Sequence, residues 1–123
     1  MKEKKVTESS DKLLSCVIKS MQDKKGSEIL SLNLQKIHAA VTDYFVICHA
    51  NSKNQVKAIA DHIIDNVLAE TGIKTYHFEG FENSEWILID YLDIVVHVFL
   101  NTTRSFYQLE DLWADAEIIA YDE

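Results

Sequence analysis

Three aspartates are the first residues in this sequence that could do chemistry together. Asp90 and Asp93 flank a short segment, and Asp43 precedes an apolar run. Convergent carboxylates can hold a divalent metal for nucleotidyl transfer, but that chemistry also needs groups that cradle phosphates. The sequence has no glycine-rich phosphate loop, and Arg104 is its one arginine. We therefore keep a metal-dependent, nucleotidyltransferase-like enzyme only as an alternative, and expect no catalytic residue, metal site or cofactor.

The neighbouring pair Cys48 and His49 could form a thiol nucleophile with its base. Adjacent residues of a strand point to opposite faces, however, so His49 is badly placed to deprotonate Cys48. We expect a buried, unreactive cysteine instead. The remaining histidines lack the spacing of zinc ligands, and we expect His97 to be a hydrogen-bonded structural residue.

A candidate contact surface comes from two segments, residues 86–90 and 94–100, which predict an antiparallel hairpin. If residue 90 faces residue 93 across a two-residue turn, residue 86 faces residue 97. One face of the hairpin is then purely aliphatic and must cover the core. The other face mixes aromatic side chains with carboxylates: Trp86, Leu88, Asp90, Asp93, Val95, His97 and Phe99. That mixture is typical of a protein contact surface, although a second packing layer with ordinary turn aspartates is equally compatible with it.

The elements that position these residues begin with a helix. Residues 1–9 are charged and predict a flexible N-terminal segment. An amphipathic helix follows, with Ser9 or Ser10 as its cap and Gly26 as its closing residue. Its apolar face comprises Leu13, Leu14, Val17, Ile18 and Met21.

Strands and a second helix are predicted in the middle of the chain. Residues 30–34 alternate as a half-buried strand, and residues 44–48 form an apolar run typical of a central strand. Ser52 and Gln55 match a reciprocal capping box for a helix that ends at Gly72. Residues 73–78 are predicted to form the next strand, so that strand, helix and strand make a right-handed parallel crossover.

Beyond the hairpin, a helix is predicted from about Ser105. Its apolar side comprises Phe106, Leu109, Leu112 and Trp113, with Trp113 in the core, and residues 115–123 have no clear assignment. The whole pattern predicts an α/β fold with one domain over residues 10–123. We expect a mixed sheet of about five strands flanked by helices.

Composition and charge exclude several classes of protein. The 123 residues suit one domain, and 47% hydrophobic residues can build a core. Two cysteines argue against a disulfide scaffold and for a reducing compartment, and the polar opening residues predict no secretory signal. Residues 75–123 hold eleven acidic side chains and one arginine, a net charge of −10. An acidic protein is a poor binder of nucleic acid or anionic membranes, whereas an acidic face suits a basic partner.

Three segments of the sequence resemble the Iojap-like family of ribosomal silencing factors. They are TDYFVICHANSKNQVKAIAD at 42–61, WILIDYLDIVVHVFL at 86–100 and RSFYQLEDLWADA at 104–116. The resemblance covers nearly the whole chain. The sequence departs from the family pattern in three places: Leu92 stands where glycine is usual, Thr102-Thr103 replaces an acidic pair, and Glu117 stands where proline is common.

The resemblance implies a cytosolic protein with a nucleotidyltransferase-like sheet but no transferase activity. It also implies binding to the large ribosomal subunit through large-subunit ribosomal protein fourteen, which blocks joining of the small subunit and represses translation under nutrient limitation. Homodimers are common in the family, and a homodimeric interaction module is a further alternative. Combining the resemblance with the mixed face, we expect the ribosomal protein to be bound by Trp86 as anchor, with Tyr91 at the rim. The other expected contacts are Asp90, Asp93, Glu79 and His97.

Overall fold

A computed structural model describes the backbone of residues 2–123 and the side chains of residues 11–123. This described part of the chain forms four helices and six strands. In order they are α1 (Lys2–Asp23), β1 (Ser27–Asn33), β2 (Tyr44–Ala50), α2 (Lys53–Thr71), β3 (His77–Glu79), β4 (Trp86–Asp90), β5 (Ile94–Leu100), α3 (Asn101–Tyr107), α4 (Leu109–Leu112) and β6 (Glu117–Tyr121). The predicted α/β class and mixed sheet are confirmed.

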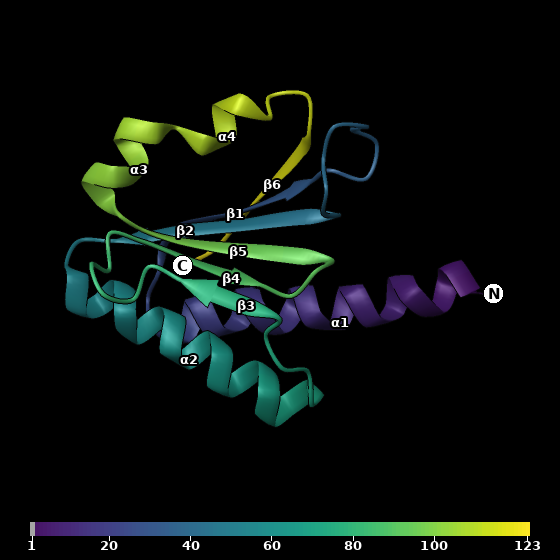
Figure 1. Cartoon of the computed structure of the whole chain (residues 1–123), viewed down its shortest axis with the longest axis horizontal. Coiled ribbons are helices and arrows are strands. Elements are labelled where there is room, and N and C mark those ends of the chain that lie inside the picture. The colour runs from purple at the N-terminus through teal and green to yellow at the C-terminus, as the bar shows by residue number, and fades with distance from the viewer. Residues whose placement is uncertain (1) are drawn as a thin grey trace.

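The strands form one mixed sheet in the order β3-β4-β5-β2-β1-β6. Only β2 and β5, at its centre, run parallel to each other, and the remaining neighbours are antiparallel. The sheet has one strand more than the sequence predicts, because the unassigned tail adds β6 to the edge of β1. Figure 1 shows α1 and α2 together on one side of this sheet and α3 and α4 on the other.

The side of the sheet covered by α1 and α2 holds the larger core. The aliphatic face of the hairpin lies here, as predicted, with Ile87, Ile89 and Val96 fully buried. Ser52 caps α2 by accepting from the Gln55 N–H at 3.2 Å, and Gly72 closes it at φ 75°. The predicted return bond from the Gln55 side chain to the backbone of Ser52 is wrong, because the Gln55 side-chain amide donates to the carbonyls of residues 24 and 25 instead.

The first helix is longer than predicted and ends differently. It begins at Lys2, so the predicted caps Ser9 and Ser10 lie inside it. The left-handed residue at its end is Lys25, at φ 59°, and not Gly26. Gly26 follows it and donates its N–H to the carbonyl of Met21 at 2.8 Å. Flexibility of residues 1–9 stays a prediction.

The register of the hairpin differs from the prediction by two residues. Asp90 pairs with Val95 and Trp86 with Phe99. The two turn residues are 92 and 93 and not 91 and 92, because Tyr91 continues the pairing and donates its N–H to the carbonyl of Ile94 at 2.8 Å. A shift of two residues leaves every side chain on its predicted face. The predicted faces of β4 and β5 are therefore correct although the pairing is not.

The predicted strand at residues 73–78 is mostly irregular. Only His77–Glu79 joins the sheet, as β3. Before it, the Thr75 hydroxyl donates to the backbone carbonyl of Asp90 at 3.0 Å, and Tyr76 N–H donates to the same oxygen at 2.8 Å. These contacts hold residues 75 and 76 at the end of β4. β3 runs in the same direction as β2 but lies three places from it, with β4 and β5 between.

The predicted single helix after the hairpin is wrong. Gln108, at φ 47°, adopts a left-handed conformation and separates α3 from α4. The break divides the predicted apolar stripe, so Leu109 is buried while Phe106 and Leu112 are 79% and 74% exposed. Trp113 is only partly buried, at the edge of the smaller core that α3 and α4 cover.

Candidate functional site

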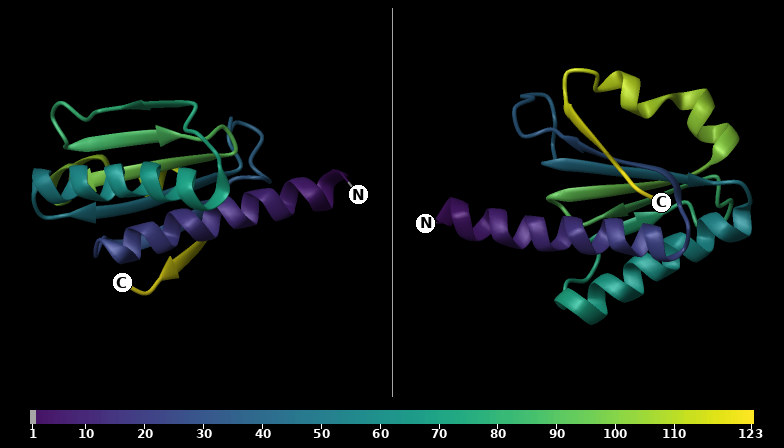
Figure 2. Two further views of the ribbon diagram at one scale, coloured as in Figure 1. Left: turned by 90° about the horizontal axis from the view of Figure 1, so that it is seen from below. Right: turned by 180° about the vertical axis from the view of Figure 1, so that it is seen from behind.

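One face of the β3, β4 and β5 strands carries most of the residues that the sequence indicates as a contact surface. The register places Glu79 beside Leu88, and Leu88 beside His97. Residues alternate along each strand, so side chains two positions apart share a face. We call this the β3–β5 face, made of His77, Glu79, Trp86, Leu88, Asp90, Val95, His97 and Phe99. It is opposite α1 and α2 (Figure 2).

A groove of about 410 Å³ opens on the β3–β5 face between β3 and β4. Its walls are Glu79, Gly80, Trp86 and Leu88. Gly80 is at φ 96°, and a side chain there would collide with the backbone carbonyl of Trp86. Glycine at this position therefore lets the loop after β3 run close against β4. The groove combines an apolar floor with one exposed carboxylate, Glu79.

Trp86 is half-buried and held on several sides. Its indole Nε1–H donates to Nδ1 of His97 at 3.1 Å. Its ring lies against Phe99, with the ring centroids 4.8 Å apart, and against Tyr107 of α3, with the centroids 5.0 Å apart. One edge of the indole is therefore packed while the remainder lines the groove. This combination of a fixed ring and an exposed edge suits an interface anchor.

His97 lies beneath Trp86 and does not reach the surface, being 3% exposed. The structural role predicted for it is confirmed by the bond from Trp86, and Phe45 packs edge-on against its ring at 4.6 Å between centroids. Burial lowers the pKa of His97 to about 3. The imidazole is therefore neutral at physiological pH. Because the ring is buried, His97 cannot contact a partner directly.

The turn at the end of the face holds two of the predicted acidic residues. Oδ1 of Asp90 accepts the backbone N–H of Leu92 at 2.7 Å, which supports a leucine held at φ 74°. The backbone carbonyl of Asp93 accepts from the N–H groups of Asp43 and Tyr44, at 3.0 and 3.1 Å. The Asp93 side chain is exposed. Asp93 is therefore open to a partner, while Asp90 also stabilises the turn.

Tyr91 does not belong to this surface. It is 6% exposed and packs into the core beneath α1 and α2, on the other side of the sheet. Burial raises the pKa of its phenol. The expected rim contact is wrong, because Tyr91 continues the alternation of β4 and points to the same side of the sheet as Ile87 and Ile89.

Among the residues considered for catalysis, the fold places Asp43 close to Asp93 but separates Cys48 from His49. Burial, and then the nearby charge of Asp93, raise the pKa of Asp43. The side chains described for residues 11–123 include no cluster of three His, Cys, Asp or Glu able to hold a metal ion. Cys48 is fully buried in the larger core, and burial raises its pKa to about 12. His49 points to the opposite face of β2. The pair therefore has the separated arrangement that the sequence predicts.

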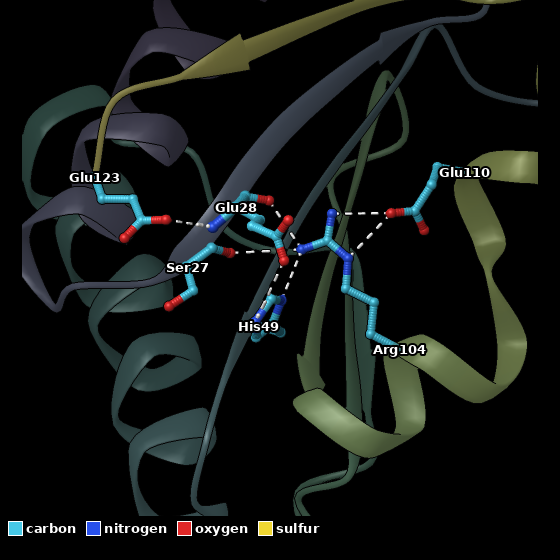
Figure 3. A network of polar contacts seen from close by, with 6 residues as sticks. All are labelled: Ser27, Glu28, His49, Arg104, Glu110 and Glu123. Atoms are coloured by element: carbon cyan, nitrogen blue, oxygen red, sulfur yellow. Dashed lines mark hydrogen bonds and ion pairs between the residues drawn. The ribbon is translucent and has the colours of Figure 1, made fainter.

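Sequence reasoning missed a second polar centre, around Arg104. This α3 residue is 7% exposed. Its Nε and Nη2 donate to the same oxygen of Glu110, at 3.1 and 2.9 Å, and its Nη1 donates to the backbone carbonyl of Glu28 at 2.8 Å. Figure 3 shows the guanidinium between α4 and the start of β1. Arg104 therefore ties both short helices to the sheet.

His49 and Glu28 extend this centre to the end of the chain. Arg104 Nη1 donates to His49 Nδ1 at 3.0 Å, so the ring proton lies on Nε2, which is 3.7 Å from a Glu28 carboxylate oxygen. Burial, and then the charge of Arg104, lower the pKa of His49. Glu28 itself is at φ 46°, and its N–H donates to the Glu123 carboxylate at 2.9 Å. The network is a structural tie between α3, α4, β1 and the C-terminal residue (Figure 3).

Comparison with known proteins gives consistent results. Residues 7–123 match the family model described as "Ribosomal silencing factor during starvation". The chain is 44% identical to ribosomal silencing factor RsfS of Bacillus subtilis, over 89% of this chain and 92% of that protein. It is 42% identical to RsfS of Halalkalibacterium halodurans, over 90% and 93%. A crystal structure of a Chromobacterium violaceum protein, 33% identical, superposes with a TM-score of 0.79 over 85% of each chain.

Proposed function

Because the chain belongs to the family of ribosomal silencing factors, we propose that it represses translation by occupying the large ribosomal subunit. In this proposal the protein binds large-subunit ribosomal protein fourteen and physically blocks joining of the small subunit when nutrients are scarce. It acts in the cytoplasm as a binding protein, and no catalytic step is required. The described residues contain no helix long and apolar enough to cross a membrane.

The observation that carries this proposal is the groove beside Trp86. A fixed aromatic ring with one open edge can enter or receive an apolar side chain at little ordering cost. Leu88 continues the apolar floor, and Glu79 stands at its margin. Such a centre, apolar in the middle and polar at the rim, is the usual anatomy of a protein–protein contact.

Charge supports a basic partner for the same face. Residues 75–123, which include β3, β4 and β5, carry a net charge of −10. Glu79 and Asp93 are exposed on or beside the β3–β5 face. Ribosomal proteins are a basic class, and complementary charge speeds their encounter with an acidic surface. The acidity of the surface also disfavours ribosomal RNA as the main contact.

The groove can be tested with Trp86→Ala in a subunit-joining experiment. Purified small and large subunits are mixed with the protein, and the joined ribosome is separated from free subunits on a sucrose gradient. We expect the unaltered protein to reduce joining and Trp86→Ala to lose most of that effect, because the change removes the proposed anchor.

A matched control is Ile119→Ala, which removes an exposed apolar side chain from β6 at the opposite edge of the sheet. This variant should inhibit joining as well as the unaltered protein does. Equal inhibition by all three proteins would show that the β3–β5 face is not the docking surface.

A further inference from the structure

The indole of Trp86 is hydrogen-bonded to His97, a buried residue of the β3–β5 face. Trp86 stands opposite Phe99 in the register and His97 stands opposite Leu88, so the bond between Trp86 and His97 is a diagonal contact between β4 and β5. The indole N–H only donates hydrogen bonds. His97 Nδ1 must therefore be its acceptor, which requires an unprotonated nitrogen at that position.

This tautomer leaves His97 with an unused donor. With Nδ1 accepting, the ring proton lies on Nε2, and Nε2 is buried without a hydrogen-bond partner anywhere in the described part of the chain. A buried donor without an acceptor destabilises a fold, and an apolar side chain would avoid that penalty. The surroundings are otherwise aromatic, with Phe45 and Phe99 beside the ring. Packing alone therefore gives no reason for a histidine here.

From these contacts we infer that His97 is a positioning residue, whose Nδ1 holds the Trp86 indole in the orientation that shapes the groove. The inference rests on the proposed function, in which Trp86 is the anchor. It adds that His97 fixes the orientation of Trp86 before the partner binds. A side chain already held in its bound orientation loses less freedom on binding. The neutral imidazole that burial enforces keeps the acceptor available.

Three variants separate positioning from simple packing. His97→Leu removes the acceptor and keeps an apolar filler, while His97→Asn keeps an acceptor atom near the place of Nδ1. Trp86→Phe removes the indole donor and keeps an aromatic ring. Each protein is tested for co-sedimentation with purified bacterial large ribosomal subunits, and its folding is checked by a thermal melt.

We expect His97→Leu to bind about tenfold more weakly, the factor that corresponds to one hydrogen bond. His97→Asn should recover most of that loss. In the Trp86→Phe background, His97→Leu should have little further effect, because the bond is already absent. A His97→Leu protein that binds like the unaltered chain, or an equal loss in both backgrounds, would overturn the inference.

A spectroscopic measurement observes the bond without the ribosome. Nitrogen-15 NMR shows one indole N–H signal for each of the two tryptophans, and Trp86→Phe identifies the signal of Trp86. That signal should exchange slowly with solvent in the unaltered protein and quickly in His97→Leu. Unchanged exchange in a folded His97→Leu protein would also contradict the inference. The proposed function is tested separately: if Trp86→Ala binds normally, the docking surface is wrong whatever His97 does.

Discussion

Arg104 and Glu110 face each other across the break between α3 and α4, and two guanidinium nitrogens contact the same carboxylate oxygen at 3.1 and 2.9 Å. The left-handed Gln108 between the two helices brings them into this position. Because Arg104 also donates to the Glu28 carbonyl and to His49, it connects the α3–α4 segment to β1 and β2. The same segment carries Tyr107, which packs on Trp86. This partly buried ion pair therefore supports one side of the proposed contact surface.

Arg104→Gln should lower the free energy of unfolding by about 3 kcal/mol, since it leaves the Glu110 carboxylate without its charged partner in a partly buried place. Urea denaturation measures this directly. Glu110→Gln is the matched control, and it should cost less because a neutral amide can still accept a bond from Arg104. A loss below about 1 kcal/mol for Arg104→Gln would mean that the network contributes only what a surface pair does.

Charge reversal tests the acidic side of the contact. Glu79→Lys combined with Asp93→Lys should weaken co-sedimentation with large subunits, most strongly at low salt, because the two exposed carboxylates lie where a basic partner would approach. Asp90 is left unchanged, since its side chain supports the turn at Leu92.

The matched control for this experiment is Asp61→Lys with Asp65→Lys, which reverses two exposed charges on α2. It changes net charge by the same amount on the other side of the sheet. If both pairs weaken binding equally, overall charge and not the β3–β5 face controls the association.

Trp113 should contribute mainly to the stability of the fold, and Trp86 mainly to binding of the large subunit. Trp113 packs edge-on against Phe45 at 5.8 Å between ring centroids and is only partly buried, so Trp113→Ala should cost about 2 kcal/mol of stability, less than a full core tryptophan. Trp86→Ala should weaken binding about 30-fold, as loss of an interface anchor does. Thermal melts and co-sedimentation of both variants decide the matter. Strong loss of binding in a stable Trp113→Ala protein would place the anchor at Trp113, just after α4.

Stability should fall as the pH drops below 6.5. Burial lowers the pKa of His97 from 6.5 to about 3, so the unfolded chain binds a proton that the folded chain rejects. The stability contribution is complete above pH 6.5 and is lost progressively toward pH 3. Between pH 7 and pH 5 the loss from His97 should be about 2 kcal/mol. The lowered pKa of His49 adds to it in the same direction.

Urea unfolding at the two pH values measures this loss. His97→Leu should remove most of it, whereas His38→Leu, in an exposed loop position, should leave it unchanged. An undiminished pH dependence in His97→Leu would show that other groups control acid stability.

Which side chains share a face of β4 and β5 is predictable, because it depends only on whether residue numbers along a strand differ by an even or an odd number. A register error of two residues leaves these groups of side chains unchanged. This is why Trp86, Leu88 and His97 are correctly grouped from the sequence. Burial of His97 is not predictable in this way, since it depends on what α3, α4 and the neighbouring aromatic side chains cover. The alternation assigns a residue to a face of the sheet, but it does not tell whether that part of the face is exposed to solvent.

The Arg104 network shows a different limit. Its partners include the backbone carbonyl of Glu28, at a positive φ, and the side chain of Glu123 at the far end of the chain. Backbone groups and left-handed residues such as Gln108 carry no side-chain signature that periodicity could detect. The signal available in the sequence is an isolated arginine in an acidic region, followed six residues later by Glu110. It indicates an ion pair but not its partners in β1 and β2.

The most direct test of the central claim is photo-crosslinking from the groove to the ribosome. A photoreactive amino acid replaces Glu79, the exposed carboxylate in its wall, and the protein is irradiated with purified large subunits before the crosslinked partner is identified by mass spectrometry. The same amino acid at Ile119 serves as the control. The account predicts a crosslink from position 79 to ribosomal protein fourteen and none to it from position 119. Crosslinking to that protein from position 119 alone, or from position 79 only to another ribosomal component, would contradict the account.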